Sequence, residues 1–267
     1  MAEAERPRIV LASFPRSGNT FLRNILLDVF GMYSWNNIVV YNKGLKDYKN
    51  LSHAKKFRTI TAPGERKLQK LTDQMAFPVV KTHELPKNIL PLCNPQTKII
   101  YLVRDGRDAL VSMAHHRKDI IEPGSDYIDN LKEALWAPMG SYFGGWGANV
   151  REWTKIADLV IHFDELVNDT EKVIERLREV LDLPEPDMQK IPTFDSQRKG
   201  GSHFGGKKRK KLSQEEQDAF NQQFFRSGKS GGWKEEMPED IQEKFWDKYS
   251  DIMIKMGYSR DGSIKQD

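Results

Sequence analysis

The feature that most constrains this 267-residue chain is an apolar run that passes through a tight polar turn into a helical pattern. Ile9–Phe14 is typical of a buried strand and Phe21–Phe30 of an amphipathic helix, and the turn between them contains Arg16, Ser17 and Thr20. A helix that starts directly after a strand directs unpaired backbone N–H groups, and the positive end of its dipole, at one point. The sequence therefore predicts a turn that binds phosphate or a similar oxyanion.

This turn differs from the common nucleotide triphosphatase loop, in which a lysine follows the second glycine and precedes Ser or Thr. Here the cation, Arg16, precedes Gly18. A P-loop kinase that uses ATP and magnesium remains an alternative, although no convincing metal-binding aspartate follows a strand. Taken alone, the turn also fits a helix cap without a ligand.

The charge of the chain is unevenly distributed. The net charge is +4, but the segment 198–211 holds seven Lys and Arg residues and no acid, so the remainder carries −3. Such a segment fits a solvated loop, a localisation-type signal, a nucleic-acid patch, or the entrance of a site for an anionic ligand. A non-enzymatic module that binds an anionic polymer is thus a second alternative. No nucleic-acid-binding motif accompanies it, so we expect no nucleic-acid partner.

Cysteine usage and hydropathy indicate the cellular setting. The only cysteine, Cys93, excludes an internal disulfide and a cysteine-based zinc site. Without a leader or a long apolar run, we expect a cytoplasmic protein with no membrane span.

Strand-like runs alternate with helical patterns along the chain, which predicts an α/β fold: one domain over 1–267, its core at about 8–258, with a central parallel sheet flanked by helices. The expected strands are Ile9–Phe14, Phe77–Lys81, Lys98–Val103 and Asp158–Phe163. The expected helices are Asn19–Phe30, Gly106–His116, Gly147–Ala157, Thr170–Leu181, Ser213–Phe225 and Pro238–Met256.

Two segments, 43–74 and 121–147, lack a clear strand pattern, and we expect these insertions to carry substrate specificity. The aromatic residues in or near them are candidates to line a substrate pocket or to fill ordinary core: Trp35, Trp136, Tyr142, Phe143 and Trp146.

A second ligand signal follows the strand at Phe77. Lys81 and His83 lie two residues apart and so share a face of an extended segment. At the carboxyl end of the sheet, His83 would serve as a general base and Lys81 would stabilise charge on a leaving group. The alternative is a histidine that makes only a structural hydrogen bond.

Two further segments are rich in anion-binding groups. Arg104 follows a strand and Ser112 lies two turns into the next helix, so the pair would hold a second phosphate; the alternative is a surface ion-pair cluster around Arg104. Later, Arg226, Ser227 and Gly228 open a glycine-rich turn that fits either a phosphate site or a mobile surface loop.

With these motifs in this order, the chain resembles the soluble, cytosolic-type sulfotransferases that use 3′-phosphoadenosine 5′-phosphosulfate (PAPS), from about Ile9 to Tyr258. The family's phosphosulfate loop matches Phe14–Thr20, and its Lys-Thr-His segment matches residues 81–83. Its arginine with a serine eight positions on falls on Arg104 and Ser112. Its closing Arg-x-Gly and Gly-x-Trp-Lys fall on Arg226–Lys234.

The resemblance implies a P-loop-like sulfotransferase fold and transfer of a sulfuryl group from PAPS, without a metal, leaving adenosine 3′,5′-bisphosphate (PAP). The acceptor would be a hydroxyl or amine of an unidentified small molecule or glycan, with His83, Lys81 and Arg16 as catalytic residues. Its implied donor-binding residues are Arg16, Ser17, Gly18, Asn19, Thr20, Phe21, Arg104, Ser112, Phe163, Phe194, Arg226, Ser227 and Gly228.

The chain departs from the family at four positions. Arg16 and Ser227 stand where lysine is usual, Phe163 replaces a tyrosine, and Gly232 replaces an aspartate. These changes bear on details of donor binding. The family's C-terminal dimerisation segment is not recognisable, which leaves the oligomeric state open.

Overall fold

The computed structural model describes residues 8–40, 56–60, 79–136, 145–204 and 212–264. Its centre is one six-stranded sheet with the order β3-β2-β4-β1-β5-β6. The strands β2, β4, β1, β5 and β6 pair in parallel, and β3 pairs antiparallel to β2 at one edge. The strands are β1 Ile9–Ser13, β2 Ser34–Val40, β3 Lys56–Ile60, β4 Val79–Thr82, β5 Lys98–Val103 and β6 Leu159–His162.

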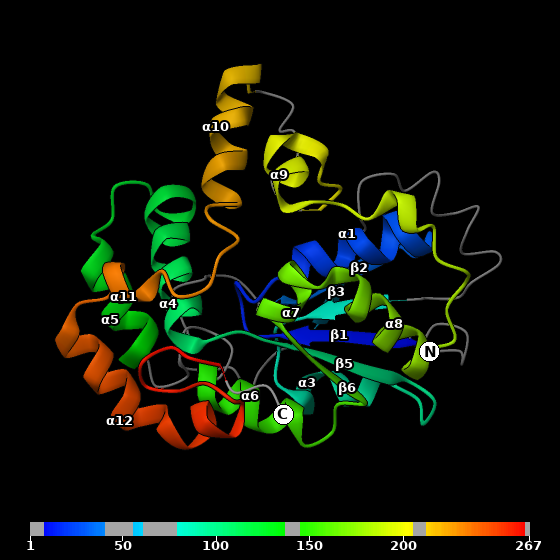
Figure 1. Ribbon diagram of the computed structural model, residues 1–267, viewed down its shortest axis with the longest axis horizontal. Coiled ribbons are helices and arrows are strands. Elements are labelled where there is room, and N and C mark those ends of the chain that lie inside the picture. Colours follow the sequence, from blue (N-terminus) through cyan, green and yellow to red (C-terminus); the bar gives the residue numbers. More distant parts are fainter. Residues whose placement is uncertain (1–7, 41–55, 61–78, 137–144, 205–211, 265–267) are drawn as a thin grey trace.

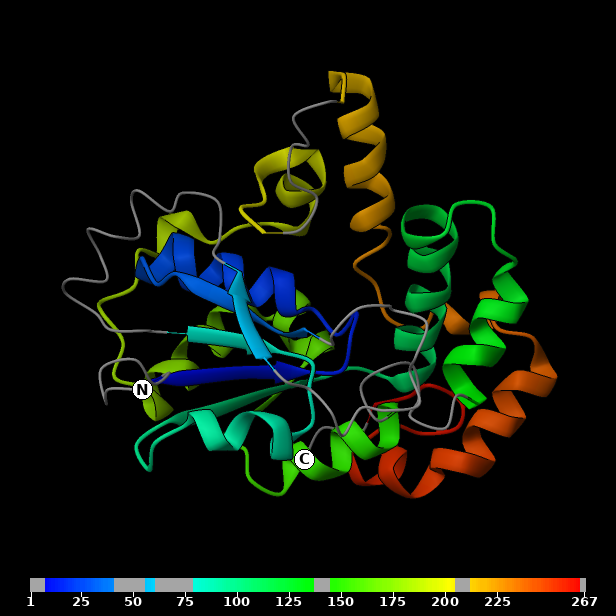
Figure 2. The ribbon, with the colours of Figure 1, turned by 180° about the vertical axis from the view of Figure 1, so that it is seen from behind.

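Both faces of the sheet are covered by helices, so successive side chains of the central strands enter different cores. From β1, Ile9 and Leu11 pack with helices α1 and α8, whereas Val10 and Ala12 pack with α4, α6 and α12 on the other face. This two-residue alternation within wholly apolar strands is what a parallel sheet covered on both sides requires. Seen from behind, α3 and α6 lie in front of the sheet (Figure 2).

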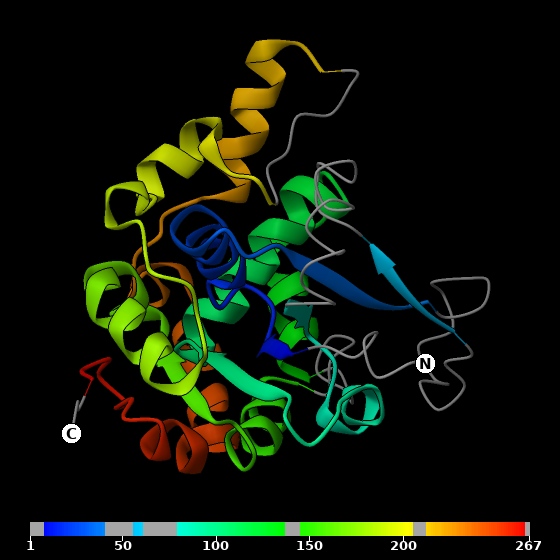
Figure 3. The ribbon, with the colours of Figure 1, turned by 90° about the vertical axis from the view of Figure 1, so that its right-hand side faces the viewer.

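The helices include the expected long ones within one to three residues at each end, and several short ones. They are α1 Asn19–Phe30, α3 Pro86–Ile89, α4 Gly106–His116, α5 Tyr127–Trp136, α6 Trp146–Thr154, α7 Phe163–Asn168, α8 Thr170–Val180, α9 Phe194–Ser196, α10 Gln214–Phe224, α11 Trp233–Glu236 and α12 Glu239–Lys255. Short 3₁₀ and π turns complete them: η3 Leu90–Leu92, η4 Arg117–Ile121, η6 Met188–Lys190 and η7 Gln197–Gly201. Helix α10 projects away from the sheet (Figure 3).

Local capping explains two of the helix starts. Ser213 and Glu216 form the reciprocal capping box of α10, and the side chain of Asp169 accepts a hydrogen bond from the amide of Lys172 at the start of α8. These contacts satisfy amides that a helix leaves without an internal partner.

The predicted central parallel sheet flanked by helices is confirmed, and the structure adds two strands, β2 and β3, to the four that were expected. Strands β2 and β3 were not expected, and β3 lies within the segment 43–74, which was judged to lack strand pattern; helix α5 lies within 121–147. Strand β2 begins with Ser-Trp-Asn-Asn before an apolar Ile-Val-Val, and β3 reads Lys-Phe-Arg-Thr-Ile, so neither has a clear alternation. Strand β3 is at the edge of the sheet and β2 lies between β3 and β4, and backbone pairing with these neighbours stabilises both strands.

The parallel register brings the carboxyl ends of β1, β4, β5 and β6 to one edge. Ala12 lies beside Thr82 and Tyr101, and Val103 lies beside His162. The segments that follow these strands therefore meet, as in other open α/β sheets that bind ligands at this edge. Among the helices of the described ranges, none combines the length and the apolar character needed to cross a bilayer.

Candidate active site

The turn after β1 is held in an unusual backbone conformation. Arg16 has a positive φ of 67° and Gly18 a φ of 95°, both in the left-handed region. Two features exclude a side chain at Gly18. Its φ is in the left-handed region, and a Cβ atom would lie 2.8 Å from the ring of Phe163. The turn delivers the chain into α1 at Asn19, so the first amides of α1 face the edge of the sheet where the ligand is expected.

The Arg16 side chain is held by residues far away in the sequence. Its Nε donates to Ser112 Oγ on α4 at 3.0 Å, and its Nη2 donates to the carbonyl of Phe224 at the end of α10 at 2.6 Å. Burial, followed by the charges of Arg104 and Arg226, lowers the pKa of Arg16 to about 10. Three guanidinium groups are thus close enough to repel one another, an arrangement that a bound anion stabilises.

Arg104 links the turn to the C-terminal part of the chain. Its Nη1 donates to the carbonyl of Arg16 at 3.0 Å, its Nη2 donates to the carbonyl of Lys229 at 2.8 Å, and its guanidinium lies over the ring of Phe163 at 4.2 Å. The carbonyl contact helps to hold Arg16 at its positive φ. Only 6% of Arg104 is exposed.

Several polar atoms of this region are buried and have no hydrogen-bond partner in the described part of the chain. They include Nε of Arg104, Nε of Arg226 and the hydroxyl of Ser17. Arg226 is otherwise held by Glu236, whose two carboxylate oxygens each lie 2.8 Å from its Nη1. Buried donors without acceptors are costly, and a phosphorylated ligand would supply acceptors here. These residues therefore fit a nucleotide with several phosphate oxygens.

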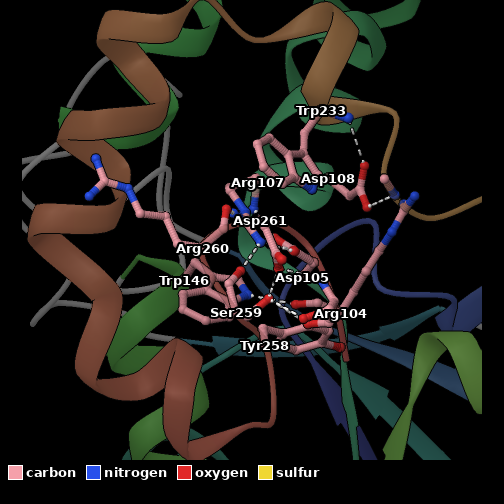
Figure 4. A network of polar contacts seen from close by, with 12 residues as sticks. Arg104, Asp105, Arg107, Asp108, Trp146, Trp233, Tyr258, Ser259, Arg260 and Asp261 are labelled. Carbon is pink, nitrogen blue, oxygen red and sulfur yellow. Dashed lines mark hydrogen bonds and ion pairs between the residues drawn. The ribbon is translucent and has the colours of Figure 1, made fainter. Parts of the chain in front are cut away.

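The cluster of charges beside Arg104 is a buried network, so its interpretation as a surface ion-pair cluster was wrong. Arg107 is 1% exposed; it is paired with Asp105, lies over the ring of Trp233 at 3.6 Å and donates to the carbonyls of Ser259 and Arg260 (Figure 4). Ionised groups can be buried in this way because each finds a partner of opposite charge or polarity.

Asp108 anchors the turn that carries Arg226. Its carboxylate accepts hydrogen bonds from the amides of Gly231 at 2.7 Å and Trp233 at 3.1 Å, and it is 3% exposed (Figure 4). No local sequence pattern indicates this role, since both partners lie more than 120 residues away. Trp146, a candidate for the substrate pocket, is buried and donates its Nε1–H to the carbonyl of Arg104, so it is a core residue.

His83 lies directly beyond β4, next to the turn after β1. Its Nδ1 is 2.8 Å from the carbonyl oxygen of Ser13. A carbonyl only accepts, so Nδ1 carries the ring proton in the neutral imidazole and the lone pair is on Nε2. Burial, and next the charge of Lys81, lower the pKa of His83 well below 6.5, so the ring is neutral near pH 7.

Helix α6, which packs on the face of the sheet opposite to α1, holds the backbone at His83. Asn149 donates to the carbonyl of His83 at 3.1 Å and accepts from the hydroxyl of Tyr101 at 2.9 Å. The indole of Trp153 donates to the carbonyl of Glu84 at 2.9 Å. These contacts keep the chain after β4 rigid and so restrict the position of the imidazole.

Lys81 is accompanied by a second cation that the sequence interpretation missed. Arg23 of α1 is 4% exposed, and donates to the hydroxyl of Ser34 at 2.6 Å and to its carbonyl at 3.1 Å. Burial, and then the charge of Arg23, lower the pKa of Lys81 well below 10.5. Arg23 occupies a position that helical periodicity alone assigns to an ordinary amphipathic helix, and only its burial reveals it.

Two of the aromatic residues predicted to bind the donor, Phe21 and Phe194, lie close together. The rings of Phe21 and Phe194 are 6.4 Å apart between centroids, with an interplanar angle of 49°. A Cβ atom on Gly228, whose φ is 64°, would lie 2.6 Å from the ring of Phe194. Ser227 is exposed, and its hydroxyl accepts from the amide of Lys229. Thr20 is half-buried on the first turn of α1.

The beginning of the basic segment 198–211 contacts α1. Ser202 accepts from the side chain of Asn24 at 2.8 Å, His203 pairs with Asp28, and the ring of Phe204 lies 3.9 Å from the guanidinium of Arg23. Residues 205–211 lie outside the described ranges. So do Tyr142, Phe143 and most of the segment 43–74, whereas Trp136 is 51% exposed.

Comparison with known proteins agrees with this geometry. A family model described as sulfotransferase domain matches residues 6–257. Dog sulfotransferase 1A1 is 26% identical over 272 residues, covering 96% of this chain and 87% of the relative, and mouse sulfotransferase 1 family member D1 is 26% identical over 267 residues, covering 92% and 83%.

Solved structures share the fold. Mouse sulfotransferase SULT7A1 complexed with PAP has a TM-score of 0.62 at 19% identity and covers 94% of this chain and 86% of its own. Retinol dehydratase in a complex with retinol and PAP has a TM-score of 0.59 at 17% identity, covering 97% and 83%.

The buried cations at this edge of the sheet, and the turn that leads into α1, fit an enzyme that acts on a phosphorylated ligand. The chain belongs to the sulfotransferase domain family.

Proposed function

We propose that His83 is the general base of sulfuryl transfer and that the acceptor is a hydroxyl or an amine. The observation that carries the proposal is the 2.8 Å contact between His83 Nδ1 and the carbonyl of Ser13, which assigns the lone pair to Nε2. A neutral imidazole of this tautomer beside the anion-binding turn can take the proton of an incoming nucleophile. A small molecule or a glycan as acceptor, and a cytoplasmic location, remain predictions.

The proposed donor is PAPS. When bound, it supplies a sulfuryl group attached to its 5′-phosphate, and PAP leaves as an anion. Lys81 and Arg16 would stabilise the negative charge that develops on the leaving phosphate oxygen, together with Ser17 and the first amides of α1. The negative charge of the donor would also raise the lowered pKa values of Lys81 and His83, because it opposes the cations that depress them.

The remaining residues would bind the nucleotide. Arg104, Ser112 and Arg226 would hold the 3′-phosphate. This role is supported by the Nε atoms of both arginines, which have no hydrogen-bond partner within the part of the chain that the structure describes. Phe21 and Phe194 would flank the adenine. Phe163 would hold the guanidinium of Arg104 flat and pack against Gly18.

The first experiment is a thermal-shift titration of the whole chain with PAP and with ATP, each with and without magnesium. A ligand that binds only the folded state raises the melting temperature. Stabilisation by PAP alone, independent of magnesium, is the expected result. Stabilisation only by ATP with magnesium would contradict the proposed nucleotide site.

The second experiment tests the base. His83→Gln should lower turnover about 10²–10⁴-fold, the usual contribution of a general base, and leave PAP binding nearly unchanged. Turnover is measured as PAP released from PAPS in the presence of a panel of phenols, alcohols and amines. His203→Gln, a change at an exposed histidine, is the matched control. Retained turnover in His83→Gln would remove His83 from this role.

A further inference from the structure

One polar contact beside His83 is not explained by donor binding or by proton transfer. The hydroxyl of Ser13 lies 3.3 Å from His83 Nδ1, the same nitrogen that donates to the Ser13 carbonyl. Because Nδ1 carries a proton, the Ser13 hydroxyl can only accept from it. The proton of the Ser13 hydroxyl must therefore be directed elsewhere. Ser13 is fully buried, so bulk solvent does not reach its hydroxyl.

The side-chain amide of Asn19 is the neighbour that can accept this proton. One of its two terminal atoms lies 2.9 Å from the Ser13 hydroxyl. The other terminal atom is buried and has no partner in the ranges that the structure describes, and Asn19 is 5% exposed. Amide oxygen and nitrogen have nearly the same shape, so their assignment follows from the hydrogen-bond partners.

Only one orientation of the amide satisfies the buried groups. With the amide nitrogen toward Ser13, the hydroxyl accepts from two donors, and its own proton has no acceptor among the described residues. With the amide oxygen toward Ser13, the hydroxyl donates to Asn19 and accepts from His83. The NH₂ group then occupies the position that has no partner in the described ranges, in the same turn as the Ser17 hydroxyl, which likewise has none there.

We propose that Ser13 and Asn19 are positioning residues that connect the donor-binding turn to His83. This series of hydrogen bonds runs from His83 Nδ1–H to the Ser13 hydroxyl and from that hydroxyl to Asn19 Oδ1. The Asn19 NH₂ group donates to the anionic part of the donor. This inference rests on the proposed function, in which the turn binds the phosphosulfate group and His83 takes the proton.

This series of hydrogen bonds would counteract the effect of the nearby positive charges, which make His83 a weak base. Lys81 from β4, Arg23 from α1 and Arg16 from the turn all face His83 with positive charge. When Nε2 takes a proton, positive charge spreads to Nδ1–H, and the acceptors of Ser13 stabilise it. The Ser13 hydroxyl is a better acceptor when its own proton is held by Asn19, since successive hydrogen bonds polarise one another.

The test is a nitrogen-15 NMR study of the whole chain. The ring signals of His83 are identified among the six histidines by their loss in His83→Gln. The tautomer is measured without nucleotide, and the pKa of His83 with saturating PAP, while PAP affinity is measured by calorimetry. The variants are Ser13→Ala and Asn19→Asp, with Ser125→Ala as matched control because Ser125 also accepts from an asparagine amide, at 2.8 Å.

The two variants test separately the hydrogen bond at His83 and the contact of Asn19 with the donor. Ser13→Ala should lower the pKa of His83 by about one unit, the effect of one weak hydrogen bond to a charged group, with PAP affinity changed less than about threefold. Asn19→Asp keeps an acceptor for Ser13 but places a negative charge toward the donor. It should weaken PAP binding at least about tenfold without lowering the pKa of His83.

An Nε2–H tautomer of His83, or a pKa in Ser13→Ala equal to that of the wild type, would overturn this series of hydrogen bonds. Unchanged PAP affinity in Asn19→Asp would overturn the amide orientation. Absence of PAP binding by the unsubstituted protein would instead overturn the proposed function, so the two failures are distinguishable. A shift of the same size in Ser125→Ala would assign the effect to general loosening and also count against the proposal.

Discussion

Replacement of Arg104 by methionine tests the proposed 3′-phosphate site most directly. Methionine keeps much of the apolar stem that packs near Phe163 and removes the guanidinium. The variant loses the donors to the carbonyls of Arg16 and Lys229, and it also loses the buried Nε atom that has no partner within the described residues. We expect PAP binding to weaken far more than binding of adenosine 5′-monophosphate, which lacks the 3′-phosphate.

The magnitude follows from the number of contacts. A hydrogen bond from a charged group contributes about 1.5–3 kcal/mol, and at least the Nε atom is available to a phosphate oxygen. Since about 1.4 kcal/mol corresponds to a tenfold change in affinity, one lost bond should raise the dissociation constant for PAP about 10- to 100-fold. The monophosphate should be affected no more than about threefold.

The assay is isothermal titration of both nucleotides into the wild type and the variant. Loss of the two carbonyl contacts will also destabilise the turn, but that effect acts on both nucleotides and cancels in the ratio of their dissociation constants. Arg176→Met is the matched control, because Arg176 likewise donates to a backbone carbonyl, that of Val160 at 2.9 Å, away from the site. Equal losses for both nucleotides in Arg104→Met would refute the assignment.

Three further changes test other parts of the structure. Asp108→Ala should lower the free energy of unfolding by about 3 kcal/mol in urea titrations, because two backbone amides lose a charged acceptor; a loss below about 1 kcal/mol would contradict the anchoring role. Gly18→Ala should abolish PAP-dependent thermal stabilisation, because a φ of 95° and a Cβ atom 2.8 Å from Phe163 exclude a side chain; normal stabilisation would show that the turn relaxes freely. Burial is the main reason that the pKa of His116 is lowered to about 3, so the folded protein keeps this ring neutral while the unfolded chain takes up a proton below pH 6.5. The free energy of unfolding should therefore fall by about 2 kcal/mol from pH 7 to pH 5 because of this residue. His116→Phe should reduce this pH dependence in unfolding experiments, and an unchanged pH dependence would assign it to other groups.

Much of the fold could be predicted from the sequence because its signals are local. The apolar runs of β1 and β5, the polar turn at Arg16 and the caps of α8 and α10 are each encoded by neighbouring residues. Strands β2 and β3 could not be predicted in this way, since pairing with another strand, rather than their own pattern, makes them strands.

The candidate site also contains features that the sequence predicts and features that only the tertiary structure reveals. Three of the motifs that the sequence revealed follow strands, and parallel pairing brings Arg16, His83 and Arg104 to one edge. The long-range contacts that support them have no local sequence signal. Ser112 holds Arg16 across 96 positions of sequence, and Asp108 accepts from the amide of Trp233 across 125.

The sequence by itself therefore determined the strand-turn-helix unit, the anion-binding character of the turn and the residue types available for chemistry. The tertiary structure decided which charged groups are buried, which nitrogen of His83 carries the proton, and which atoms lack a protein partner within the described residues. Burial and hydrogen-bond satisfaction depend on every neighbour in space, and for Arg16, His83 and Asn19 most of these neighbours are supplied by distant parts of the chain or by a turn back to the preceding strand.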